Sequence, residues 1–147
     1  MAFPAAQVPE IAAVIQLSVA PVFLLAGVGA IVNAMSMRLS RVIDRARQLE
    51  GDLERADARR AERIHDELVT LSRRARLIGL GVALSVLCAL LVTVLLIAAF
   101  VDAFLAADFS YALATIFVAA LGAFSASLVV FLREVLMATV SLRIGPH

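Results

Sequence analysis

Long apolar segments without a charged residue flank one strongly charged segment of this chain. Three runs, residues 11–37, 77–101 and 109–132, contain no Asp, Glu, Lys or Arg. A helix needs about 20 residues to cross the roughly 30 Å hydrocarbon core of a bilayer, and each run is longer than that. The pattern predicts an all-α integral membrane protein with three transmembrane helices, which together form a single membrane domain over residues 1–147.

The charged segment, residues 38–76, carries a heptad spacing of apolar positions typical of coiled coils. The apolar residues recur at steps of three and four, first Leu39, Val42, Ala46, Leu49 and Leu53, then Ile64, Leu68, Leu71, Ala75 and Ile78. The two equal stripes predict an antiparallel helical hairpin that continues the first span and returns into the second, with its tip near residues 56–61. Gly51 is either a weak point of the descending helix or an earlier turn.

Positive charge is concentrated in the same hairpin. Eleven of the thirteen cationic side chains, all of them Arg, fall between residues 38 and 76, whereas the first ten residues and residues 101–109 contain none. Short loops rich in Arg stay on the cytoplasmic side of the membrane. We therefore expect the N-terminus and the connection that carries Asp108 to lie outside, and the hairpin and the tail ending at His147 to be cytoplasmic.

Composition agrees with a membrane location. The chain is 63% hydrophobic with a mean hydropathy of +0.99, well above an ordinary soluble domain. The absence of Lys beside abundant Ala and Arg is typical of GC-rich bacterial genomes, so we expect the bacterial inner (plasma) membrane. Eight acidic residues lie among the eleven arginines of the hairpin, and no aromatic residue does. This mixture favours a salt-bridged solvent face and disfavours nucleic-acid binding.

One side of the first helix combines small, polar and charged residues. At 100° per residue, Ala26, Gly29, Ser40 and Asp44 lie within about 40° of Asn33, with Met37 and Arg47 near the same limit, and Val42 and Leu49 lie close to the opposite side. The predicted stripe comprises Ala26, Gly29, Asn33, Met37, Ser40 and Asp44. An amide turned towards lipid is unfavourable by a few kcal/mol, so we expect this stripe to line a pore or an intersubunit contact. The alternative is that Asn33 bonds a neighbouring helix and Asp44 pairs with arginines of its own helix.

Three helices of one chain leave no room for a solute path, so a conducting protein of this kind must be a homo-oligomer. The first interpretation is an ion channel or pore for an inorganic ion, lined by the first helix. The alternative is a non-conducting scaffold whose cytoplasmic hairpin binds a partner protein or anionic lipid.

Catalysis and cofactor binding find little support in the sequence. His65 and His147 are far apart without a ligand companion, and Cys88 is alone. No phosphate-binding loop or nucleophile elbow occurs. We expect no enzyme activity, no metal and no cofactor. None of the spans holds an ionisable residue of the kind used for coupled transport or voltage sensing.

Two motifs at the predicted inner membrane boundary resemble a known family. The run "RLSRVIDRAR" and the later "FLREV" are similar to the pattern R-x-x-R-[VI]-[IL]-D-R-A-R and the third-span exit of the bacterial family catalogued as domain of unknown function 2721. The resemblance implies a small three-span membrane protein without an established activity. It places distinctive residues at the inner boundary, namely Arg38, Arg41, Asp44, Arg45, Arg47, Arg133 and Glu134. We expect an ion-pair network there, with Arg133 or Glu134 pairing with Arg41, Asp44 or Arg45.

Overall fold

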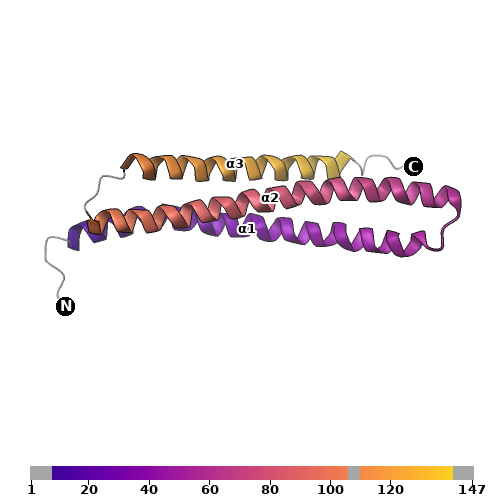
Figure 1. Cartoon of the computed structure of the whole chain (residues 1–147), viewed down its shortest axis with the longest axis horizontal. Helices are drawn as coiled ribbons and strands as arrows, with labels where there is room; N and C mark the ends of the chain where they lie inside the picture. The colour runs from indigo at the N-terminus through magenta and orange to yellow at the C-terminus, as the bar shows by residue number, and fades with distance from the viewer. Residues whose placement is uncertain (1–7, 106–109, 141–147) are drawn as a thin grey trace. The chain divides into compact units, whose positions relative to one another are not determined.

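The chain folds into long α-helices. The computed structural model describes residues 8–105 and 110–140. They form α1 (Val8–Leu53), α2 (Ala58–Leu105) and α3 (Ser110–Val140) (Figure 1). Each of these helices is long and apolar enough to cross a membrane. The predicted all-helical chain with three membrane-length helices is confirmed, while Asp108 and the tail ending at His147 lie outside the described residues.

The predicted spans and hairpin arms are continuous helices. α1 has 46 residues and α2 has 48, so at 1.5 Å per residue each is about 70 Å long, more than twice the hydrocarbon core of a bilayer. Pro21 lies inside α1, and the helix continues through it and through Gly51 to Leu53. A large part of α1 and of α2 must therefore extend beyond any bilayer that they cross.

A short turn over residues 54–57 connects α1 to α2. The Ala56 N–H donates a hydrogen bond of 3.3 Å to the carbonyl of Leu53, which ends α1. Asp57 caps α2, because its Oδ1 accepts a 3.0 Å hydrogen bond from the Arg60 N–H, three residues into the helix. The predicted tip near residues 56–61 overlaps the end of this turn and the first residues of α2.

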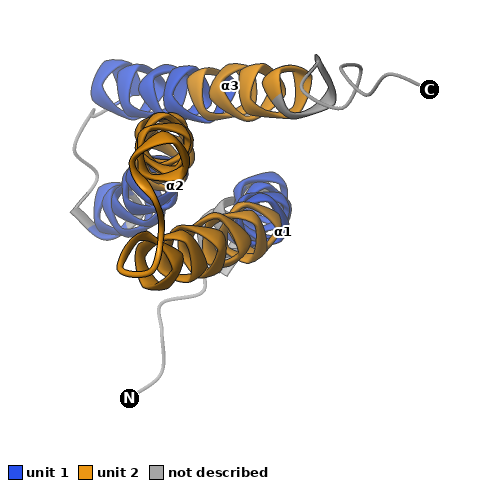
Figure 2. Ribbon diagram, turned by 90° about the vertical axis from the view of Figure 1, so that its right-hand side faces the viewer, with its two compact units in different colours: residues 1–31, 85–125 blue, residues 32–84, 126–147 orange. Residues whose placement is uncertain are grey.

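The chain divides into two compact units, each built from segments of all three helices (Figure 2). Unit 1 comprises residues 1–31 and 85–125, and unit 2 comprises residues 32–84 and 126–147. In unit 1, Cys88, Val92 and Ala120 are fully buried. Aliphatic side chains of α2 and α3, among them Ile97 and Leu113, line a groove of about 300 Å³ in the same unit.

In unit 2 the three helices approach closely around Gly81 of α2. A Cβ atom at Gly81 would lie 2.8 Å from Cε of Met35 on α1 and 3.4 Å from Cγ1 of Val130 on α3. The Ser127 hydroxyl on α3 donates a 2.9 Å hydrogen bond to the Gly81 carbonyl. The missing side chain at Gly81 therefore makes room for both neighbouring helices.

Buried positions recur every seven residues along each helix. They are Val28, Met35, Val42 and Leu49 on α1, Ile64, Leu71, Ile78, Ser85 and Val92 on α2, and Ala120, Ser127 and Glu134 on α3. Burial within residues 38–76 agrees with the predicted apolar stripes, and the same spacing continues into the apolar segments. Leu53 is the exception at 37% exposed, because it is the last residue of α1 before the turn.

Candidate functional site

A buried carboxylate in unit 2 pairs with an arginine from each of the other two helices. Glu134 of α3 is 2% exposed. Its Oε2 accepts a 2.6 Å hydrogen bond from Nη1 of Arg38 on α1, and its Oε1 accepts a 2.9 Å hydrogen bond from Nη2 of Arg74 on α2. We call these residues the ion-pair triad. Because each carboxylate oxygen binds a different helix, Glu134 connects α1, α2 and α3.

The surroundings of the triad explain how a carboxylate is tolerated there. A buried charge is strongly unfavourable unless it is paired and hydrogen-bonded, and both oxygens of Glu134 are. The Arg38 side chain is 37% exposed and that of Arg74 is 27% exposed, so both cations keep part of their hydration. The Arg38 guanidinium also lies over the Phe131 ring, 5.3 Å from its centroid, at a distance favourable for a cation–π interaction.

The helix packing at Gly81 sets the register that brings the triad together. Arg38 and Glu134 each lie about one helical turn beyond the residues of α1 and α3 that approach Gly81. Arg74 lies two turns before Gly81 on α2, which runs in the opposite direction. The ion pairs show that the three side chains meet in unit 2.

The observed ion pairs of Glu134 differ from those expected from the sequence. Glu134 does take part in an ion-pair network, but its partners are Arg38 and Arg74 instead of Arg41, Asp44 or Arg45. Arg41 and Arg45 are exposed on α1, and Arg45 pairs with Glu67 of α2 instead.

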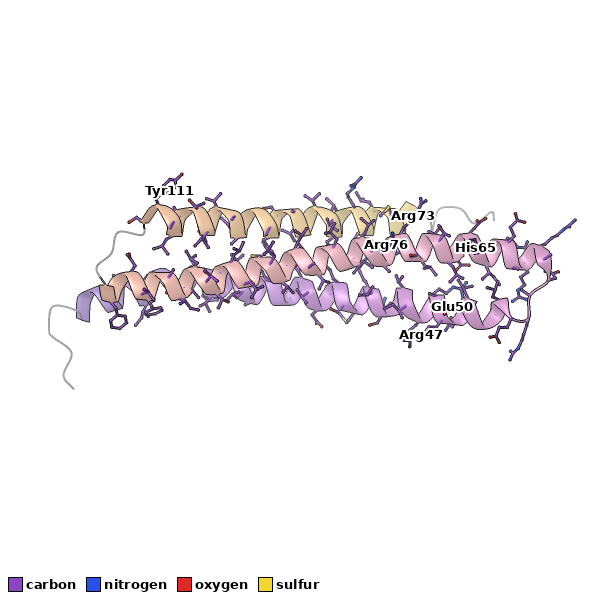
Figure 3. The ribbon with its side chains drawn as sticks, in the orientation of Figure 1. Arg47, Glu50, His65, Arg73, Arg76 and Tyr111 are labelled. Carbon is purple, nitrogen blue, oxygen red and sulfur yellow. The ribbon has the colours of Figure 1, made fainter. Side chains whose placement is uncertain are left out.

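The other residues expected in the network have separate positions. The Arg45 Nε donates a 2.9 Å hydrogen bond to Oε1 of Glu67 on α2, and both side chains are about half exposed. Arg133 is exposed and has no ion pair within residues 8–105 and 110–140. Arg47 is exposed as well, and it projects from α1 on the side away from α2 (Figure 3). Within the described residues, none of these three arginines forms an ion pair with Glu134.

Arg74 was missed because it is one of three arginines in the motif "LSRRARLI". Its spacing would have distinguished it, since it lies three residues after buried Leu71 and four before buried Ile78. Arg38 likewise lies three residues after buried Met35 and four before buried Val42. An arginine at this spacing falls beside the helix contact, whereas Arg73 and Arg76 are exposed on α2.

A groove beside the triad concentrates positive charge. It has a volume of about 340 Å³ and is lined by Arg38, Arg41, Val42, Arg45, Leu71, Arg74 and Glu134. We call it the arginine groove. Its four arginines and one carboxylate give a net charge of +3. The Nε of Arg74 is buried and has no hydrogen-bond partner in the described chain, so a donor remains unsatisfied beside the groove.

The stripe predicted on the first helix lies on the exposed side of α1. All six of its residues are exposed: Ala26, Gly29, Asn33, Met37, Ser40 and Asp44. The opposite side of α1 is buried at Val28, Met35 and Val42. The Ser40 hydroxyl donates to the Ser36 carbonyl at 3.1 Å, while no hydrogen bond is formed by the Asn33 amide within the described residues. We call this surface the α1 stripe.

The residues considered for metal or thiol chemistry are dispersed. His65 is exposed on α2 near the turn, whereas Arg47 lies on α1 (Figure 3). Cys88 is buried in unit 1. Among the described residues, no group of three or more His, Cys, Asp or Glu side chains is placed to hold a metal ion.

Comparison with known proteins identifies the family but not an activity. A search of curated proteins gave no match, and neither did a search of solved structures. The model of one family, described as protein of unknown function (DUF2721), matches residues 18–144. This match includes the α1 stripe, the ion-pair triad and the arginine groove. The chain therefore belongs to the DUF2721 family of proteins of unknown function.

Proposed function

We propose that the chain is an integral protein of the bacterial inner membrane that assembles as a homo-oligomer, with the α1 stripe facing the axis and lining an ion pathway. The observation that carries this proposal is the exposure of the whole α1 stripe, including the amide of Asn33. The opposite side of α1 is already occupied by contacts within the chain.

Asn33 would be unfavourable in contact with lipid. It lies in the charge-free part of α1, about one and a half helical turns before Arg38, the first arginine. An amide without a hydrogen-bond partner in hydrocarbon is unfavourable by a few kcal/mol. Contact with a second copy, or with water on an axial path, removes this cost. Ala26 and Gly29 on the same stripe favour close helix contact.

A path for ions requires several copies of the chain. Channels select ions with rings of polar and charged groups around a symmetry axis. The α1 stripe would supply such rings from Asn33, Ser40 and Asp44. The concentration of arginine between residues 38 and 76 supports a cytoplasmic location for the α1–α2 turn, with the N-terminus outside.

Cysteine crosslinking tests the assembly. The buried Cys88 is first replaced in a Cys88→Ala background. When an oxidant such as copper phenanthroline is added to isolated membranes, Ser40→Cys on the α1 stripe should form disulfide-linked dimers, whereas Thr70→Cys, exposed on α2, should not. Equal crosslinking at both positions, or none at Ser40→Cys, would contradict an interface through the stripe.

Ion flux tests conduction. Purified protein in liposomes should carry a potassium or chloride flux that changes with Asn33→Leu and with Asp44→Asn. The matched control is Asp66→Asn, which removes the same charge from an exposed position on α2. A well-folded oligomer that leaves the liposomes impermeable would refute the channel while keeping the assembly.

A non-conducting scaffold is the second candidate. It is favoured by Arg59, Arg60 and Arg63, which are exposed at the beginning of α2. Arg60 has only a long contact of 3.7 Å with Asp52, so these cations remain accessible to a partner protein. Glutamine at all three positions should abolish recovery of a crosslinked partner without changing oligomer size. If only α1 stripe substitutions alter recovery, the scaffold is excluded.

A further inference from the structure

We propose that the arginine groove binds the phosphate of an anionic membrane lipid. The groove lies where the charge-free runs of all three helices end: Arg38 directly follows the first run, Arg74 lies three residues before the second, and Glu134 lies two residues after the third. In a membrane this is the level of the lipid headgroups. The inference rests on the membrane location proposed above and is independent of conduction.

The donors of the groove suit a phosphate group. Each guanidinium has five N–H donors, and Glu134 takes one from Arg38 and one from Arg74. Arg41 is exposed without an ion pair in the described chain, and the Arg74 Nε is buried without a partner. Arginine binds phosphate oxygens through paired, charge-assisted hydrogen bonds. The groove therefore offers free guanidinium donors, and Glu134 holds the guanidinium groups of Arg38 and Arg74 in place.

The nearby carboxylates leave the groove positive. Glu134 is used by two arginines, and Glu67 neutralises part of the charge of Arg45 from α2. Including Glu67, the net charge is still +2. Binding an anion in the groove reduces this excess.

The lining favours a lipid over a soluble anion. Val42 and Leu71 are apolar, and the Phe131 ring lies under the Arg38 guanidinium. A phosphate attached to acyl chains gains from apolar surface beside the charged site, whereas free phosphate does not. Basic pockets between membrane helices on the cytoplasmic side bind anionic headgroups by this combination.

Native mass spectrometry of the purified full chain in mixed micelles tests the proposal. The probes are phosphatidylglycerol, phosphatidylcholine as the neutral lipid, and sodium phosphate. Arg41→Gln with Arg45→Gln removes two groove arginines, and both are exposed, so the fold should be retained. The matched control is Arg47→Gln with Arg55→Gln, which removes the same charge from exposed residues that do not line the groove.

The expected result is selective retention of phosphatidylglycerol by the wild-type chain. The groove variant should bind it at least about fivefold more weakly, and the control variant should match the wild type. An equal loss in both variants would show general charge attraction and overturn the site. Displacement of phosphatidylglycerol by millimolar sodium phosphate would overturn the lipid as its occupant. Equal retention of phosphatidylcholine would overturn recognition of the phosphate charge.

Discussion

Replacing Glu134 by Gln is the sharpest test of the ion-pair triad. Gln has nearly the same shape as Glu, but it carries no charge and presents an amide N–H₂ where one carboxylate oxygen stood. One of the two arginines then faces another donor, and both lose their counter-charge. The variant therefore changes electrostatics with little change in packing.

The contacts of Glu134 set the size of the effect. Removing one partner of a fully buried ion pair costs about 3–5 kcal/mol of folding free energy. Arg38 and Arg74 remain 37% and 27% exposed, so water compensates part of this loss. We expect Glu134→Gln to lower the free energy of unfolding by about 3 kcal/mol. With the unfolding entropy of a typical domain, that corresponds to a midpoint shift on the order of 10 °C.

Labelling of the buried thiol of Cys88 can report unfolding. Cys88 is the sole cysteine of the sequence and is 0% exposed, so a thiol-reactive fluorophore should label it only as the protein unfolds. Heating the purified protein in detergent with this fluorophore gives the midpoint. The matched control is Glu67→Gln, which removes one exposed ion pair at the same 2.9 Å separation and should cost at most about 1 kcal/mol.

A double-mutant cycle separates pairing from other effects. Arg38→Gln combined with Glu134→Gln should be less destabilised than the two single changes added together, with a coupling energy on the order of 1–3 kcal/mol. A midpoint for Glu134→Gln no lower than that of Glu67→Gln, or a coupling energy near zero, would refute the stabilising role of the triad.

Three further substitutions test the packing and the turn with the same labelling assay. Gly81→Val should lower the free energy of unfolding by about 1–3 kcal/mol more than Gly79→Val. The new side chain meets Met35 at position 81 but has open space at position 79. Equal losses in the two variants would contradict the close packing at Gly81. Ser127→Ala should cost about 1 kcal/mol or less through the lost hydrogen bond to the Gly81 carbonyl, and a stabilised variant would contradict it. Asp57→Ala should cost about 1 kcal/mol at the start of α2, whereas Asp57→Asn, which keeps a capping oxygen, should be close to wild type.

The buried positions within residues 38–76 were predictable from sequence because the residues between them are polar. Between residues 38 and 76, apolar side chains such as Val42 and Leu71 stand out among charges, and their spacing reveals which face is buried. Inside the spans this contrast disappears, since lipid-facing and chain-facing residues are both apolar. Val92 at 0% exposed and Ile97 at 61% exposed differ only in their positions on α2. The buried face of each span therefore needed the structure.

The sequence marked two members of the triad but did not predict their pairing. Glu134 was marked by its motif at the end of the third apolar run, and Arg38 by its place at the end of the first. Which arginines reach Glu134 depends on the sliding of one helix along another. That register is set by the close packing at Gly81, and the sequence holds no local signal for the axial offset of α3.

Glu134 is synthesised after both of its arginine partners. Arg38 and Arg74 both leave the ribosome before α3, so their shared counterion arrives with the last helix to be synthesised. Until then, two guanidinium groups at the end of the apolar segments depend on water or lipid for neutralisation. Synthesis of the final helix thus supplies the carboxylate that completes both pairs.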